Sequence, residues 1–129
     1  MDKIAIVGEH DKGLGEPFSR STLSGKRLAA IIEKLPQVFY LDNAFDYCDG
    51  QATQKDLSYL RAYTGVIALG KISFCELERQ GIRCVYLPHP AARRKEHLAS
   101  LEAGLCAIAN DGANTWALFP NIRYGKSAL

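Results

Sequence analysis

The chain has 129 residues, of which 47% are hydrophobic and 23% charged, which is enough for one domain with a buried core and ordinary for a globular protein. Its 16 basic and 14 acidic residues leave a net charge of +2, which excludes a strongly basic overall surface but leaves room for a local basic patch. No apolar run approaches the roughly 20 residues of a membrane span, and Met1 leads into a strand pattern rather than a signal peptide. We therefore expect one cytoplasmic domain over residues 1–129, monomeric and without a membrane partner.

Short apolar runs alternate along the chain with segments whose apolar residues recur at helical spacing. The runs predict strands that are buried on both faces, at Ile4–Val7, Val38–Leu41, Val66–Leu69 and Cys84–Leu87. The helical spacing predicts helices at Ser24–Leu35, Thr53–Tyr63, Ile72–Gln80 and Arg93–Ala109. Ser24 and Thr53 are the expected N-caps, and Gly81 is the expected C-cap of the third helix.

Repeated strand–helix alternation predicts parallel βαβ units with right-handed crossovers. The expected fold is therefore α/β, a three-layer sandwich in which a four-stranded parallel sheet is flanked by helices. After a turn at Asn110–Gly112 the pattern weakens. We expect a short docking segment at Trp116–Phe119 and a frayed end over Arg123–Leu129.

The cysteines are widely separated. They form no C-x-x-C pair, whereas most metal or cluster sites contain at least one such closely spaced pair. Cys84 lies in a strand pattern and Cys106 in a helical one, where a free cysteine behaves as a small apolar residue. We expect no metal and no cofactor, and we expect all of the cysteines to be reduced core residues: Cys48, Cys75, Cys84 and Cys106.

Residues able to do chemistry follow the first and the last predicted strands. Glu9 comes after Ile4–Val7 and a glycine, and His89 comes after Cys84–Leu87 and a proline. In an open parallel sheet, ligands bind beyond the carboxyl ends of the strands, where both side chains would lie. Glu9 and His89 therefore define a candidate site.

The order of the motifs around these residues resembles the uracil-DNA glycosylase superfamily, most closely its iron-sulfur branch. The resemblance covers roughly residues 4–105 and rests on these segments: Gly8-Glu9, Gly15-Glu16-Pro17-Phe18, Ser24–Leu28, Tyr40–Asn43, Gly65–Gly70 and Pro88-His89-Pro90-Ala91. The chain departs from the family in three ways. His10-Asp11 stands where the family has a Pro-Gly turn, Ala91 replaces a serine, and the cluster cysteines have no counterparts.

The resemblance implies a DNA glycosylase that hydrolyses the N-glycosidic bond of uracil or a related base. Glu9 would position water and stabilise an oxocarbenium-like state, and His89 would stabilise the departing base. Asn43 would bind the edge of the flipped base and Phe18 would stack on it. Arg93 and Arg94 would bind DNA phosphates or support a wedge in the duplex.

Each residue also has a structural explanation. Glu9 could end a strand in solvent, His89 could be a loop histidine, and Phe18 could be ordinary core. Asn43 could cap its loop, and Arg93-Arg94 could be a solvated helix start, although positive charge there opposes the helix dipole. Asp11 could replace Glu9 as the catalytic acid or could be a turn residue. His10 and His97 look like surface histidines. The residue that would exclude the 5-methyl group of thymine could be Asp11, Glu16 or Tyr47.

Two other functions stay open. The chain could be a non-catalytic module that binds a base, a nucleotide or modified DNA, for example in phage or anti-phage biology. Alternatively, it could be a transferase that acts on a nucleotide or a modified base, because fold does not dictate function.

Overall fold

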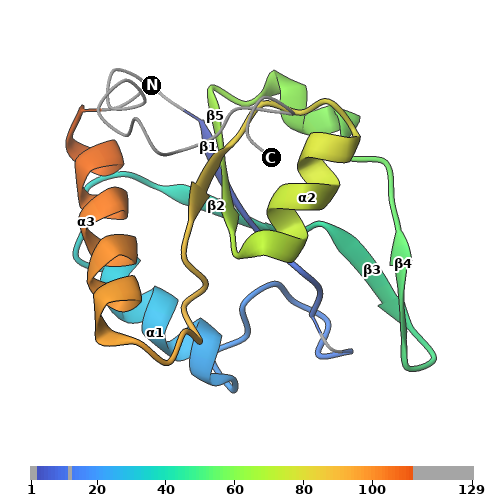
Figure 1. Ribbon diagram of the computed structural model, residues 1–129, viewed down its shortest axis with the longest axis horizontal. Helices are drawn as coiled ribbons and strands as arrows, with labels where there is room; N and C mark the ends of the chain where they lie inside the picture. Colours follow the sequence, from blue (N-terminus) through green and yellow to red (C-terminus); the bar gives the residue numbers. More distant parts are fainter. Residues whose placement is uncertain (1–2, 12, 112–129) are drawn as a thin grey trace.

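The computed structural model describes residues 3–11 and 13–111. Its centre is a four-stranded parallel sheet in the order β2-β1-β5-β6 (Figure 1). The strands are β1 (Ile4–Gly8), β2 (Phe39–Asn43), β5 (Gly65–Leu69) and β6 (Val85–Leu87). Every residue of β1 and β5 is buried, as expected for central strands covered on both faces. The prediction of an α/β fold with a parallel sheet of these strands is confirmed.

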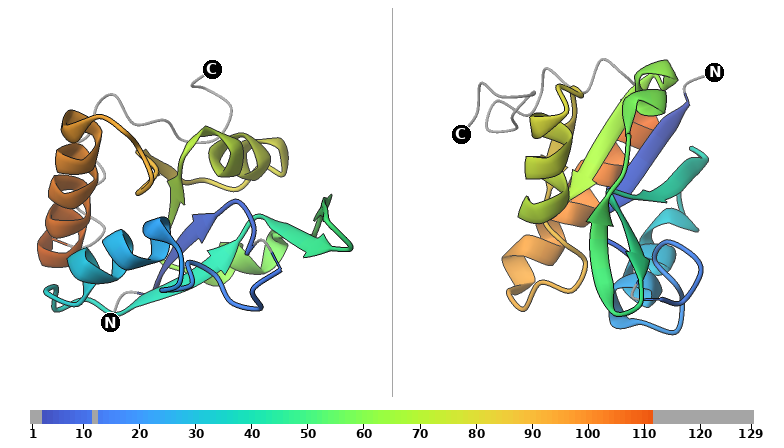
Figure 2. Two further views of the ribbon diagram at one scale, coloured as in Figure 1. Left: turned by 90° about the horizontal axis from the view of Figure 1, so that it is seen from below. Right: turned by 90° about the vertical axis from the view of Figure 1, so that its right-hand side faces the viewer.

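Helices cover both faces of the sheet, so the domain has three layers (Figure 2). Alternation along β1 sends Ile4 and Ile6 to one face and Ala5 and Val7 to the other. The first face packs against α1 (Leu23–Ile32) and α3 (Lys95–Asp111), through residues that include Leu28, Leu101, Leu105 and Ile108. The second face packs against α2 (Lys71–Arg79), through Phe74 and Leu77. Among the described residues, no helix combines the length and the apolar character needed to cross a bilayer.

The predicted helix over Thr53–Tyr63 is wrong. Its first residues belong to β4 (Gln51–Gln54), which pairs antiparallel with β3 (Phe45–Cys48) in a hairpin at the side of the molecule (Figure 1). The connecting residues, Asp49 and Gly50, both have positive φ, of 52° and 78°, as a tight hairpin turn requires.

The rest of that segment forms η1, a short 3₁₀ helix over Ser58–Ala62. The chain before it is held by Gln80, because the Leu57 N–H donates to the side chain of Gln80 (2.8 Å) and the side-chain amide of Gln80 donates to the carbonyl of Lys55 (2.8 Å). Leu57 and Leu60 still enter the core, since residues three apart lie on one face of a 3₁₀ turn. The apolar spacing was therefore correct although the helix type was not.

Several predicted boundaries and burials also differ from the structure. The N-cap of α1 is Thr22 rather than Ser24, and α3 begins at Lys95 rather than Arg93. Cys84 is buried, whereas Cys48 and Cys75 are exposed free thiols, so the prediction of core positions is wrong for these two. The segments predicted at Trp116–Phe119 and Arg123–Leu129 lie outside the described residues.

Candidate functional site

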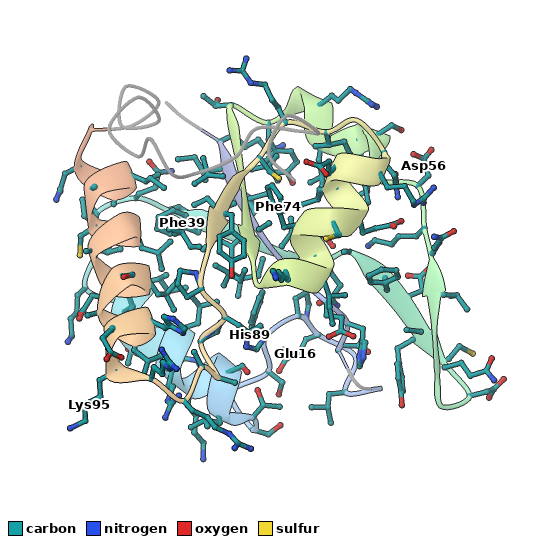
Figure 3. The ribbon with its side chains drawn as sticks, viewed as in Figure 1. Glu16, Phe39, Asp56, Phe74, His89 and Lys95 are labelled. Atoms are coloured by element: carbon teal, nitrogen blue, oxygen red, sulfur yellow. The ribbon has the colours of Figure 1, made fainter. Side chains whose placement is uncertain are left out.

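A cavity of about 130 Å³ opens at the carboxyl end of the sheet, beside the loop that follows β1. Figure 3 shows His89 at this end of the molecule, beyond the strands. Pockets for drug-sized ligands usually measure about 300–1,000 Å³, so this cavity suits a single small ring rather than a whole nucleotide. It is lined by Gly8, Glu9, His10, Asp11, Leu14, Phe18, Ser19, Thr22, Ser24, Asn43 and His89.

The structure brings together four of the six residues predicted for the site. Glu9, Phe18, Asn43 and His89 all line the cavity. The sheet explains this convergence, because β1 and β2 are neighbours with Gly8 paired to Asn43, and the loop after β6 returns to the same end. Arg93 and Arg94 do not line the cavity; both are exposed in the loop before α3.

Phe18 forms one wall of the cavity and contacts the backbone at the end of β1. A Cβ on Gly8 would lie 2.5 Å from Cζ of Phe18, so only glycine lets the ring come this close. Phe18 has a φ of +50°, which is rare for an aromatic residue and costs roughly 1–3 kcal/mol. The ring also packs against the core cluster beneath α1 and α3. Phe18 is thus both part of the core and part of the cavity wall.

The loop after Phe18 is pressed against α1. A Cβ on Gly25 would lie 1.9 Å from the carbonyl oxygen of Ser19 and 2.4 Å from that of Phe18. Thr22 caps the helix at this point: its Oγ1 accepts from the Gly25 N–H (3.0 Å) and donates to the Ser19 carbonyl (2.7 Å). The position of the Phe18 wall is therefore fixed by the start of α1.

Glu9 lies beside a histidine for which the sequence indicated no role. Nε2 of His10 is 3.5 Å from Oε2 of Glu9, and the side chains are 15% and 41% exposed, respectively. The imidazole of His10 stacks on Tyr47 of β3, with ring centroids 4.6 Å apart and an interplanar angle of 24°. His10 is thus a mostly buried residue of the cavity rather than a surface histidine.

Asp11 organises the loop after β1. Its carboxylate accepts from the N–H groups of Gly13 (2.8 Å) and Gly15 (3.2 Å), and its carbonyl accepts from the Leu14 N–H (3.0 Å). This pattern is typical of an aspartate that begins a turn. Of its two alternative roles, Asp11 therefore has that of a turn residue. Glu9 is the carboxylate better placed to bind water or a ligand.

His89 is the first residue of a tight turn. The Ala92 N–H donates to the His89 carbonyl (3.0 Å), and the Ala91 N–H donates to Nδ1 of the imidazole (3.0 Å). Because Nδ1 accepts a hydrogen bond, the proton of the neutral ring lies on Nε2, which is then a donor. The ring packs beside Gly70, where a Cβ would lie 3.4 Å from Cβ and Cδ2 of His89.

A cation on α1 holds this turn from outside. Nη1 of Arg27 donates to the carbonyls of Pro90 (3.0 Å) and Ala92 (3.1 Å). Arg27 had no recognisable role in the sequence, because its partners are more than 60 positions away along the chain and are backbone atoms. The only local signal was its place in the Ser24–Leu28 segment.

Asn43 ends β2 at the cavity. Its backbone N–H donates to the carboxylate of Asp42 (2.8 Å), which also forms an ion pair with Lys55 (3.2 Å) and accepts from the hydroxyl of Tyr59. Burial and the nearby Asp42 carboxylate raise the pKa of Tyr59 above its ordinary value, so the phenol stays a donor. Within residues 3–11 and 13–111, no hydrogen bond to the side-chain amide of Asn43 is found. That amide is therefore available to a ligand.

Comparison with protein-family models, with curated proteins and with solved structures finds no match to this chain. In the described part of the chain, no group of three or more His, Cys, Asp or Glu side chains is placed to hold a metal ion. The chemistry of the site therefore has to be inferred from its geometry: a carboxylate, an imidazole donor, an aromatic wall and an amide around one small cavity.

Proposed function

We propose that the chain is a member of the uracil-DNA glycosylase superfamily, and that it hydrolyses the N-glycosidic bond of uracil or a related modified base in DNA. One observation carries this proposal. Glu9 after β1 and His89 after β6 line the same cavity, together with Phe18 and Asn43, and the cavity has room for a single ring.

Each lining group suits one part of the reaction. An extruded base would stack on Phe18, and the amide of Asn43, which both donates and accepts, would bind its Watson–Crick edge. Glu9 would direct water at the anomeric carbon and accept its proton as the bond to the base breaks. The bonding electrons leave with the base, and the Nε2–H of His89 would stabilise the negative charge that develops on its oxygen.

The basic residues before α3 would bind the DNA backbone. Arg93, Arg94 and Lys95 are all exposed, and they precede or begin α3, where positive charge is unfavourable for the helix dipole. A phosphate bound there would offset that repulsion. This contact would position the DNA without reading its sequence.

The test is a base-release assay on single- and double-stranded oligonucleotides containing uracil, hydroxymethyluracil, hypoxanthine or mismatches, followed by alkaline cleavage at abasic sites. We expect Glu9→Gln and His89→Asn to lower the rate by about 10²–10⁴-fold. Matched controls are Glu102→Gln and His97→Asn, which change exposed side chains that do not line the cavity. Absence of abasic sites with every substrate, or equal losses in the control variants, would overturn the proposal.

A second candidate is a module that binds a base, a nucleotide or modified DNA without cleaving it. The observation that favours it is the contact between Glu9 and His10, since Nε2 of His10 lies 3.5 Å from the carboxylate and would compete with water for it. Calorimetric titration with free bases and with modified oligonucleotides distinguishes the two functions. Saturable binding with no bond cleavage would favour the module, and absence of binding would exclude it.

A further inference from the structure

We infer that Arg27 is a positioning residue for His89: it fixes the His89 turn to α1 and so holds the imidazole at the cavity. The catalytic consequence of this inference rests on the proposed function. The structural consequence does not, because it concerns the turn itself.

The turn needs an anchor because the strand before it is short and lies at an edge. β6 has three residues and, within the described part of the chain, a single neighbouring strand, β5. His89 follows this strand after Pro88, so the sheet does not fix its direction. Within the turn, Pro90 favours the backbone bend but has no N–H to donate. The turn therefore has two internal hydrogen bonds, both from alanine N–H groups.

Arg27 supplies the missing anchor. These hydrogen bonds come from Nη1 and reach carbonyls on either side of Ala91, the residue whose N–H binds the imidazole of His89. A guanidinium has fixed donor directions, so it restrains the two carbonyls relative to each other as well as to the helix. When the turn is fixed, the Ala91 N–H stays aligned with Nδ1, and the ring keeps its proton on Nε2.

The same helix also holds the Phe18 wall of the cavity. Gly25 of α1 packs against the carbonyls of Phe18 and Ser19, and Leu28 anchors the helix in the core. Arg27 lies between these two positions on the helix and reaches the His89 turn. The positions of Phe18 and His89 at the cavity are thus both tied to one rigid element, α1.

The experiment compares Arg27→Met, Arg27→Lys and a control, Lys26→Met, which removes a neighbouring exposed cation from the same helix. Amide hydrogen exchange and the ¹⁵N shifts of the His89 ring are measured by NMR in each variant. We expect exchange at Ala91 and Ala92 to be about tenfold faster in Arg27→Met, with an intermediate effect in Arg27→Lys and none in Lys26→Met. The ring ¹⁵N shifts should move from an Nε2–H form toward a mixture in the same order.

The base-release assay supplies a second measurement. In Arg27→Met we expect kcat to fall about 10–100-fold while KM changes less than about threefold, because a displaced catalytic group affects the transition state more than binding. If Arg27→Met leaves both the exchange at Ala91 and kcat unchanged, the inference is overturned. The same holds if the variant lowers Tm but changes neither the exchange nor kcat. If the wild-type protein releases no base, the proposed function fails, but the NMR comparison still decides the role of Arg27. If Arg27→Met does not fold, Arg27→Lys decides it.

Discussion

The ring of Phe18 lies against the backbone of Gly8, so the last residue of β1 and the wall of the cavity share one contact. A side chain at position 8 would have to displace the ring. Because Phe18 packs against the core and also lines the cavity, we expect the displaced ring to move into the cavity.

Gly8→Ala should therefore both destabilise the protein and fill its cavity. We expect a loss of about 1–3 kcal/mol in the free energy of unfolding, measured by urea denaturation, because overpacking forces side chains from their preferred positions. Base release should fall in the same variant. Phe18→Leu removes the atom that would clash, so the double variant should be more stable than the sum of the single changes predicts. Additive losses would show that Gly8 does not hold the ring in place.

The thiols should divide sharply in reactivity. Burial, with the negative charge of Glu78 as a smaller cause, raises the pKa of Cys84 to about 12, so its reactive thiolate is scarce at pH 8. Cys48 and Cys75 are exposed. We expect Ellman's reagent to modify Cys48 and Cys75 in the folded protein and Cys84 only after urea is added, with peptide mapping by mass spectrometry to locate the label. The double variant Cys48→Ser, Cys75→Ser is the control and should lose the fast phase. Fast labelling of Cys84 would contradict its burial.

Glu76 should make the stability of the protein depend on pH. It is buried on α2, where hydrogen bonds from Arg79 (2.7 Å) and Gln80 (2.8 Å) lower the pKa of its carboxyl below the ordinary value of 4.5. Since the folded pKa is the lower one, the charged form stabilises the fold above pH 4.5, and this contribution is lost as the pH falls through the folded pKa.

Glu76→Gln should therefore cost about 1–3 kcal/mol in the free energy of unfolding at pH 7 and progressively less in acid. Chemical denaturation at several pH values between about 7 and 2 checks this dependence. Glu102→Gln changes an exposed acid on α3 and serves as the control. If the free energies of unfolding of wild type and Glu76→Gln differ by the same amount down to the lowest pH, the pKa of Glu76 is not lowered in the folded protein.

The centre of the sheet could be predicted from the sequence because β1 and β5 are buried on both faces and read as continuous apolar runs, whereas no residue of β2 is fully buried. The β3–β4 hairpin could not be found in the same way. Every residue of β4 is exposed, so its sequence has no apolar alternation that would predict a strand. The local signal for the hairpin was the Asp49-Gly50 turn. Apolar spacing at Leu57 and Leu60 then favoured a helix that the structure shortens to one 3₁₀ turn.

The same limit applies to the cavity. Glu9 and His89 could be placed because the carboxyl ends of parallel strands meet at one edge of a sheet. The stack of His10 on Tyr47 depends on the hairpin that was missed, so its burial had no signal in the sequence. The contact of Arg27 with Pro90 and Ala92 joins a side chain to distant backbone carbonyls, and no residue pattern reports such a bond.

At the start of α1, the residue that the sequence favours as N-cap is not the residue that caps the helix. Ser24 stands at the head of the apolar pattern and is a favoured N-cap residue, yet Thr22 makes the capping bond to the Gly25 N–H. Thr22→Ala should cost about 1 kcal/mol in the free energy of unfolding, while Ser24→Ala should stay within about 0.5 kcal/mol of wild type, since it removes no cap. Thr22→Ser keeps the hydroxyl and should recover most of the loss. Thermal and urea denaturation of the three variants measure the difference. A larger loss for Ser24→Ala than for Thr22→Ala would mean that the helix begins two residues later, which would also release the Phe18 and Ser19 carbonyls from their contact with Gly25.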